Sequence, residues 1–212
     1  MMKGAIFDVD GTLLDSMGIW EDAGAHYLKG LRIEPKTGLS EILYPMTIEE
    51  GAAYIKKQYG LNESIPEIVQ GVLETVKHFY YYEVKLKEGV QEFLEKMKQK
   101  EIPMVIATSS TRDHVEAAFK RLGVDSYFEA IFTCSEVGEG KKNPLIYQKA
   151  AQYLQTKPGE TYVFEDALYA IETAKNAGFY TVGVYDRFSE NEQEQIKCKA
   201  DVYLKNMTGV CC

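Results

Sequence analysis

Short apolar runs recur along this chain and alternate with segments of helical periodicity, and this rhythm limits the possible folds more than any other feature. The first run, Ala5 to Phe7, ends in acidic residues and a glycine, which is typical of a buried strand that leads into a loop. Similar runs follow at 104–107, 130–132, 162–164 and 180–184, with a weaker sixth at 202–204. Strands and helices that alternate in this way predict a doubly wound α/β fold with a parallel sheet, whose ligands bind beyond the carboxyl ends of the strands.

Apolar residues between these runs repeat at the spacing of one helix face. The patterns consist of Val90, Phe93, Leu94 and Met97; of Val115, Ala118, Phe119 and Leu122; and of Ile171, Ala174 and Ala177. Gly123 and Gly178 directly follow the second and third patterns, at a place where glycine commonly ends a helix. We therefore expect helices to connect the strands.

The stretch from about Leu14 to Tyr82 interrupts the alternation, because it offers helical patterns without strands. Its apolar faces are Met17, Trp20, Gly24, Tyr27 and Leu31; Ile48, Ala52, Ile55 and Tyr59; and Ile68, Val72, Val76 and Phe79. Capping-box patterns at 47–50 and 64–67 predict where two of these helices begin. We predict an α/β core domain of residues 1–14 and 84–212 and an inserted helical cap domain of residues 15–83, joined by hinges near 14–16 and 82–88.

Composition and charge exclude several classes of protein. With 45% hydrophobic and 26% charged residues, the chain suits a globular fold rather than a disordered or fibrous one. The net charge is -8 and no run of Lys and Arg stands apart from acidic neighbours, so we expect no nucleic-acid partner. No signal peptide fits before Asp8 and no later apolar run is long enough to span a bilayer, so we expect a cytoplasmic protein with no membrane partner.

The cysteines are Cys134, Cys198, Cys211 and Cys212. They show neither metal-ligand spacing nor the density of a disulfide scaffold, so we expect reduced thiols. The terminal Cys211-Cys212 pair resembles a prenylated carboxyl end, but no polybasic stretch accompanies it. A frayed tail is the alternative that we favour.

Asp8 and Asp10 follow the first strand at alternate positions, and Gly11 permits a close turn after them. Both carboxylates therefore face one site if the strand ends there. The pair also fits the mere start of a loop. A calcium-binding helical hand is excluded, because it requires glycine at the sixth loop position and glutamate at the twelfth, where this chain has Leu13 and Ile19.

Further candidate groups follow later strands. The hydroxyl run Thr108-Ser109-Ser110 fits a helix cap as well as a binding loop, and Lys141 fits a solvated loop charge as well as a site residue. Glu165 and Asp166 end a buried strand. Carboxylates that cluster with Asp8 and Asp10 repel one another strongly unless a cation is present, and hard oxygen ligands favour Mg²⁺.

Phe7-Asp8-Val9-Asp10-Gly11-Thr12 resembles the first motif of the haloacid dehalogenase superfamily, Asp-x-Asp-Gly-Thr after an apolar strand. Three further motifs of the family follow in the same order. Residues 105–110 resemble the second motif, and Gly140-Lys141-Lys142-Asn143-Pro144 resembles the third, Gly-Lys-Pro-x-Pro. Residues 163–167 resemble the fourth motif, which is acidic. Lys142 replaces the usual first proline, Leu145 a common aspartate, and Ala170 a usual glycine. The resemblance implies that family's α/β core with a helical cap of the β-phosphoglucomutase and phosphoglycolate phosphatase type.

The resemblance also implies a role for each candidate. Asp8 is the nucleophile, Asp10 the acid and base, and the Mg²⁺ ligands are the side chains of Asp8 and Asp166 and the backbone carbonyl of Asp10. Thr108, the amides of Ser109 and Ser110, and Lys141 bind the phosphate. Thr108 and Lys141 are also counted among the catalytic residues, because Lys141 neutralises the charge of phosphate and nucleophile. Glu165 supports the metal site. The implied reaction is hydrolysis of a small soluble phosphomonoester, such as a sugar phosphate, through an aspartyl-phosphate on Asp8.

The cap is expected to close over the site and to recognise the leaving group. Its candidates for that role are Trp20, His26, Lys36, Tyr44 and Met46, although aromatic and methionine side chains on a helix face more often belong to the core. A phosphosugar mutase of the β-phosphoglucomutase type is the alternative within the family. The mutase has a cap histidine and a cap arginine where this chain has Trp20 and Ile48, which favours hydrolysis.

Other activities fit less well. Dehalogenases and phosphonatases of the family lack the second aspartate, which is present here as Asp10. A non-catalytic phosphoacceptor or binding protein also combines acids, a hydroxyl and a lysine on a parallel sheet, but its acceptor lies on a later strand. We therefore predict a phosphatase whose partner is a small phosphate ester and which is a monomer or a weak homodimer.

Overall fold

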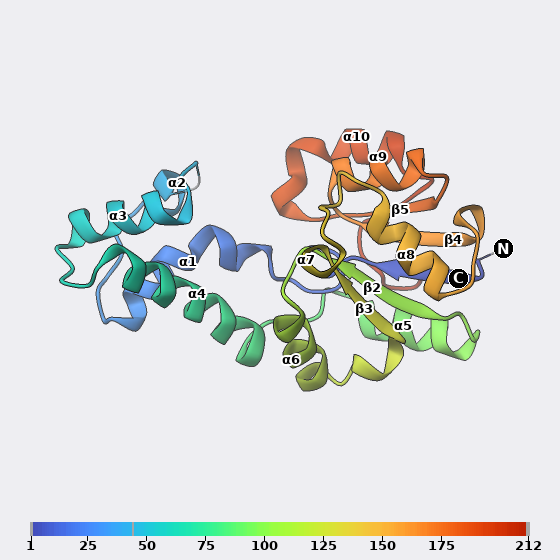
Figure 1. Ribbon diagram of the computed structural model, residues 1–212, viewed down its shortest axis with the longest axis horizontal. Helices are drawn as coiled ribbons and strands as arrows, with labels where there is room; N and C mark the ends of the chain where they lie inside the picture. The colour runs from blue at the N-terminus through green and yellow to red at the C-terminus, as the bar shows by residue number, and fades with distance from the viewer. Residues whose placement is uncertain (1, 44, 211–212) are drawn as a thin grey trace. The chain divides into compact units, whose positions relative to one another are not determined.

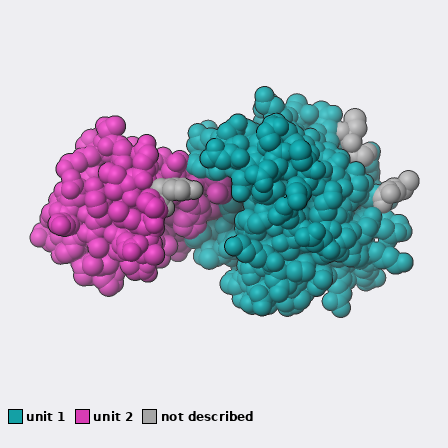
Figure 2. All heavy atoms as spheres, turned by 90° about the horizontal axis from the view of Figure 1, so that it is seen from above, with its two compact units in different colours: residues 1–15, 84–212 teal, residues 16–83 magenta. Residues whose placement is uncertain are grey.

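The computed structural model describes residues 2–43 and 45–210, and the chain in it divides into two compact units. Unit 1 consists of Met1–Asp15 and Val84–Cys212, and unit 2 of Ser16–Glu83 (Figure 2). The predicted boundaries between core and cap lie within one residue of this division. Tyr44, Cys211 and Cys212, which the sequence singled out, lie outside the described residues.

Unit 1 is built on a six-stranded sheet in which every neighbouring pair is parallel. The strands are β1 (Gly4–Phe7), β2 (Met104–Thr108), β3 (Ala130–Thr133), β4 (Thr161–Glu165), β5 (Tyr180–Val184) and β6 (Val202–Leu204). Their order is β3-β2-β1-β4-β5-β6, so β1 lies between β2 and β4. The doubly wound α/β prediction and all six predicted strands are confirmed.

Helices cover both faces of this sheet (Figure 1). They are α5 (Val90–Gln99), α6 (Arg112–Leu122), α7 (Cys134–Val137), α8 (Leu145–Tyr153), α9 (Leu168–Asn176) and α10 (Gln193–Lys199), with 3₁₀ turns η1 (Asp125–Tyr127), η2 (Pro158–Glu160) and η3 (Arg187–Glu192). Gly123 ends α6 in the left-handed conformation that its sequence position predicted.

Successive residues of β1 point to opposite faces of the sheet, and each face has its own core. Ile6 and Val163 pack with Tyr147 and Ile146 of α8. On the other face, Phe7 stacks on Phe164 with a ring-centroid distance of 4.4 Å, and Phe93 of α5 lies edge-on to both rings. Burial on both sides explains why β1 reads as a continuous apolar run.

Unit 2 is helical, with α1 (Met17–Gly30), α2 (Leu39–Leu43), α3 (Ile48–Tyr59) and α4 (Ile65–Tyr82). Both predicted capping boxes are present, at the starts of α3 and α4. The predicted face of α1 is wrong in part: Trp20 and Leu31 are exposed, whereas Ile19 and Leu28 are buried. Packing of α1 against α2, α3 and α4 decides which side is covered, and the apolar character of Trp20 does not.

The expectations about membrane-spanning segments and about the cysteines can be compared with the described residues. None of their helices combines the length and the apolar character needed to cross a bilayer. Cys134 and Cys198 are free thiols.

Candidate functional site

The carboxyl ends of three adjacent strands bring most of the predicted site residues together. Asp8 follows β1, Thr108 ends β2, and Glu165 ends β4, followed at once by Asp166. Register places Phe7 of β1 opposite Ile106 of β2 and Phe164 of β4, so the residues that follow lie next to one another. The sheet order thus explains how residues more than a hundred positions apart reach one site.

Lys141 is the link between the two acidic strand ends. Its ammonium group donates to Asp8 Oδ1 and, at 2.7 Å, to Glu165 Oε1, while its side chain is only 3% exposed. The hydroxyl of Tyr147 donates to the same Glu165 oxygen at 2.9 Å. Burial lowers the pKa of Lys141, but the charges of Asp8 and Glu165 outweigh burial and raise it, so the lysine stays protonated.

The loop before α8 holds Lys141 in this position, although Lys142 in this loop departs from the family's Gly-Lys-Pro-x-Pro pattern. Asn143 takes part in two turns: its amide donates to Gly140 O at 2.9 Å, and its side-chain oxygen accepts from the amide of Leu145 at 3.1 Å. Pro144 directly precedes α8. Asn143 therefore orders the loop that Lys142, in place of a proline, leaves without its usual restraint.

Asp166 is buried and poorly compensated. Among the described residues, Thr12 is the partner of the Asp166 carboxylate: Thr12 Oγ1 donates to Asp166 Oδ1 at 3.4 Å, which is long for a hydrogen bond. Burial, and then the charges of Asp8 and Glu165, raise the pKa of Asp166 well above its ordinary value. Burial also raises the pKa of Asp8 to about 7, against the opposing effect of Lys141.

A divalent cation fits these donors. Oxygen atoms of Asp8, Glu165 and Asp166 lie within 4.8 Å of one another, and all three residues are buried. Because Glu165 Oε1 is already shared by Lys141 and Tyr147, Asp8 and Asp166 are the side chains with most to gain from a cation. Hard carboxylate oxygens favour Mg²⁺ or Ca²⁺ over softer metals.

Asp10 has a partner that the sequence did not reveal. Ser110 Oγ donates to Asp10 Oδ2 at 2.5 Å, and the amide of Ser110 donates to Thr108 Oγ1 at 3.0 Å. The Ser110 amide was predicted to bind phosphate, but here it has a partner within the protein. Thr108 is buried and Ser109 is exposed, and their phosphate contacts stay a prediction.

A cavity of about 530 Å³ in unit 1 opens beside Lys141. Ser109, Glu139, Gly140, Lys141, Lys142, Asn143 and Tyr169 line it. Tyr169 and Glu139 were not among the predicted residues. The position of Tyr169 could have predicted its place at the cavity. Tyr169 lies in the first turn of α9, three positions after Asp166, and a helix that directly follows a strand end begins beside the site.

The predicted cap candidates other than Tyr44 lie in unit 2. Trp20 is 48% exposed and His26 is also exposed. Lys36 is exposed and its backbone amide donates to the hydroxyl of Tyr59 at 2.8 Å, and Met46 is half-buried. Their role in recognising a leaving group stays a prediction.

Comparison with known proteins agrees with these observations. Residues 5–184 match the family of haloacid dehalogenase-like hydrolases. The chain is 28% identical over 210 residues to validoxylamine A 7'-phosphate phosphatase of Streptomyces hygroscopicus subsp. limoneus, covering 99% of this chain and 96% of that protein. It is 28% identical over 177 residues to a phosphorylated carbohydrates phosphatase of Thermotoga maritima, covering 84% and 82%.

Solved structures are also similar to this chain over almost its whole length. The crystal structure of a Thermotoga maritima protein provisionally assigned as a β-phosphoglucomutase superposes with a TM-score of 0.83. The superposition covers 95% of this chain and 94% of that chain, at 26% sequence identity.

Proposed function

Because this chain belongs to the haloacid dehalogenase-like hydrolases, we propose that it is a magnesium-dependent phosphatase that hydrolyses a small phosphomonoester, such as a sugar phosphate, through a phosphorylated Asp8. The observation that carries the proposal is the buried group of Asp8, Lys141, Glu165 and Asp166 at the carboxyl edge of the sheet. The two phosphatases described above act, by their names, on validoxylamine A 7'-phosphate and on phosphorylated carbohydrates.

In the first step, a carboxylate oxygen of Asp8 forms a bond to phosphorus while the bond from phosphorus to the leaving oxygen breaks. Asp10 gives its proton to that oxygen. Ser110 holds the carboxyl group of Asp10 by its 2.5 Å hydrogen bond, which limits the positions from which the proton is delivered. Lys141 balances negative charge beside the reacting carboxylate.

In the second step, water attacks phosphorus of the aspartyl-phosphate, Asp10 takes the proton of that water, and phosphate leaves as Asp8 is restored. Asp8 and Asp166 are the side chains that would hold Mg²⁺. When bound, the ion supplies positive charge to the phosphate oxygens and favours the ionised form of Asp8. Glu165 keeps Lys141 in position.

A panel of phosphate esters tests the proposal. Purified protein is assayed for phosphate release with Mg²⁺ and with excess chelator, as wild type, as Asp8→Asn and as Asp125→Asn. Asp125→Asn is the matched control, because it makes the same chemical change in an exposed residue of η1. We expect Asp8→Asn to lower turnover by more than about a thousandfold and the control to retain it.

No phosphate release from any ester, or full turnover by Asp8→Asn, contradicts the proposal. A stable phosphorylated form that lasts for hours without turnover of any ester instead supports a non-catalytic phosphoacceptor.

The structural similarity to a protein assigned as a β-phosphoglucomutase makes a mutase the second candidate. Trp20 and Ile48 stand where the mutase pattern has residues suited to a second phosphate, which favours water as the acceptor. Glucose 1-phosphate in the panel separates the two activities. Release of inorganic phosphate supports the phosphatase, whereas formation of glucose 6-phosphate supports the mutase.

A further inference from the structure

Lys87 lies on the segment that connects α4 to α5, and its backbone is tied to the loop that follows Asp8. Its amide donates to Leu13 O at 2.9 Å, and the amide of Asp15 donates to Lys85 O at 3.0 Å. Leu86 and Leu14 form an antiparallel bridge. The stem of Lys87 is therefore held beside the loop of residues 9–14.

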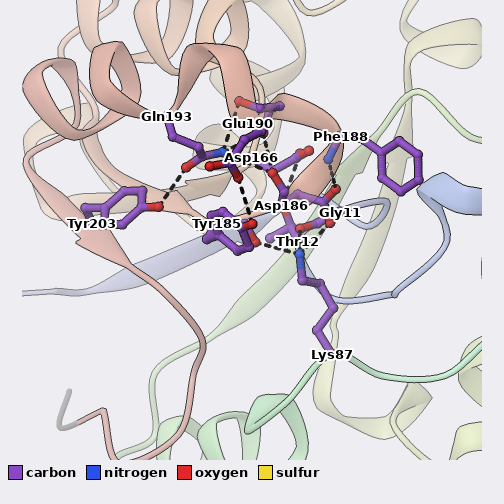
Figure 3. A network of polar contacts seen from close by, with 11 residues as sticks. Gly11, Thr12, Lys87, Asp166, Tyr185, Asp186, Phe188, Glu190, Gln193 and Tyr203 are labelled. Carbon is purple, nitrogen blue, oxygen red and sulfur yellow. Dashed lines mark hydrogen bonds and ion pairs between the residues drawn. The ribbon is translucent and has the colours of Figure 1, made fainter.

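The ammonium group of Lys87 has three acceptors. It donates to Gly11 O at 2.5 Å, to Tyr185 O at 2.7 Å and to Asp186 Oδ2 at 2.6 Å (Figure 3). The side chain of Lys87 is 16% exposed and that of Asp186 is 4% exposed. Because an ammonium group has three N–H donors, these contacts use all of them, and they join the first loop to the end of β5.

Asp186 is also held from its other side. Its Oδ1 accepts from the amide of Phe188 at 3.0 Å, and its backbone carbonyl accepts from Gln193 Nε2 at 3.1 Å. Gln193 is buried and accepts from the hydroxyl of Tyr203 at 2.7 Å (Figure 3). These contacts make Asp186 a firm anchor for Lys87, because none of them depends on the lysine.

Gly11 is the point at which this network meets the site. It follows Asp10 directly and has a φ of 82°, in the left-handed region that favours glycine. A Cβ atom at Gly11 would overlap the carboxyl group of Asp166. The backbone that leads on from Asp10 thus lies against Asp166, and a shift of the Gly11 peptide alters the positions of both acids.

We propose that Lys87 is a positioning residue of the reaction, which sets the places of Asp10 and Asp166 by holding the carbonyl of Gly11 against the anchor at Asp186. The inference rests on the proposed function of this site. The hydrogen bonds of Lys87 go to Gly11, Tyr185 and Asp186, so Lys87 acts on the two proposed acids through the backbone of Gly11. Loss of partners that orient metal ligands typically costs about tenfold to a hundredfold in metal affinity or activity.

Two variants separate positioning from simple charge balance. Lys87→Met removes the donor to Gly11 and leaves the buried charge of Asp186 without its cation, which lowers Tm. Lys87→Met/Asp186→Asn removes both charges, which restores Tm in part, while the Gly11 carbonyl still lacks its donor. Lys175→Met is the matched control, because Lys175 also donates to a carbonyl, Lys199 O at 2.6 Å, and to an aspartate, Asp201 at 2.9 Å.

The readouts are kcat, KM and the Kd of Mg²⁺ alone, measured by calorimetry. We expect kcat to fall about tenfold to a hundredfold in both Lys87 variants, Kd for Mg²⁺ to rise by a similar factor, and KM to stay within about twofold. Lys175→Met is expected to leave all three unchanged. A kcat and a Kd within twofold of wild type in Lys87→Met, or recovery of kcat together with Tm in the double variant, overturns the inference.

The same measurements keep the two proposals apart. An inactive wild type contradicts the proposed function. In that case the Kd of Mg²⁺ tests the positioning role of Lys87, and equal Kd values in wild type and Lys87→Met overturn that role. An active wild type with an equally active Lys87→Met contradicts the role of Lys87 alone.

Discussion

Lys141 and Lys87 are two lysines of unit 1 that bind oxygen atoms near the carboxyl ends of strands, yet the charge around them differs. Lys141 lies between the carboxylates of Asp8 and Glu165, with Asp166 near by, so acids outnumber the lysine. Lys87 meets one carboxylate and two backbone carbonyls, so its charge is balanced. A buried excess of negative charge is costly without a cation, whereas a balanced pair with carbonyl acceptors is complete within the protein.

This difference indicates that the groups around the two lysines have different roles. The group around Lys141 gains from a bound cation, because the positive charge offsets the excess of buried carboxylates. The group around Lys87 needs no ligand and holds backbone segments together. The predictions below test that contrast.

Of these two lysines, Lys141 is expected to give the larger effect when it is replaced, as Lys141→Met. The substitution removes the cation from Asp8 and Glu165, so we expect turnover to fall by about a hundredfold to a thousandfold. We also expect the free energy of unfolding to fall by about 3–5 kcal/mol, because buried carboxylates lose their partner. Phosphate-release kinetics and urea unfolding check both. A Lys141→Met protein with the activity and stability of Lys175→Met contradicts the special role of this lysine.

The acidic excess also predicts how stability depends on pH without metal. The pKa of Asp8 is raised by burial from 3.8 to about 7 in the folded protein, so the folded state keeps a proton that the unfolded chain releases. This contribution is fully present below about pH 4 and is lost as pH rises to about 7, at about 1.4 kcal/mol per pKa unit. Asp166 acts in the same direction.

Urea midpoints of metal-free protein at about pH 5 and about pH 8 measure this slope. Asp8→Asn is the matched variant, since its amide does not titrate, and we expect it to lose less stability between the two pH values. Equal losses in wild type and Asp8→Asn mean that Asp8 is not the group that titrates.

Magnesium is expected to stabilise the wild type. At about 100 times its Kd, a ligand that binds only the folded state adds about 2.7 kcal/mol. For a chain of this size each kcal/mol shifts Tm by about 2–4 °C, so we expect a rise of about 5–10 °C in a thermal scan. Asp166→Asn is expected to abolish the shift and to raise the metal-free Tm, because it removes a repelling charge. An unchanged shift in Asp166→Asn excludes Asp166 as a ligand.

The smallest effect is expected at the far end of the Lys87 network. Tyr203→Phe removes the hydrogen bond to Gln193 Oε1 and is expected to lower the free energy of unfolding by about 1 kcal/mol, with turnover unchanged. Tyr162→Phe is the comparison, because Tyr162 also stands on a strand and its ring lies 4.2 Å from that of Tyr180. A large loss of turnover in Tyr203→Phe extends the positioning network beyond Asp186.

Much of the fold follows from short patterns. The apolar run of β1 reflects burial on both faces, and the capping boxes at Thr47 and Ser64 satisfy local amides, so both are visible within a few residues. The exposed Trp20 shows the limit, because the covered side of α1 depends on helices that lie later in the chain.

The candidate site divides in the same way. The acids after β1 and β4 and the lysine before α8 were visible in the sequence, because each stands at a strand end or in a recognisable motif. The hydrogen bond of Ser110 to Asp10 joins residues 100 positions apart, and that of Tyr147 to Glu165 comes from the buried side of a helix. Neither residue type nor spacing predicts such a pair.

The sequence by itself determined that strands and helices alternate, that the chain has an inserted helical region, and that Asp8 stands where the first strand ends. These properties depend on periodicity and on hydrogen bonds between near neighbours. Only the tertiary structure decided that Lys141 joins Asp8 to Glu165 and that Lys87 reaches Gly11, 76 positions away, and Asp186, 99 positions away. The order of strands in the sheet and the packing of their loops place those partners within reach, and no local pattern encodes either.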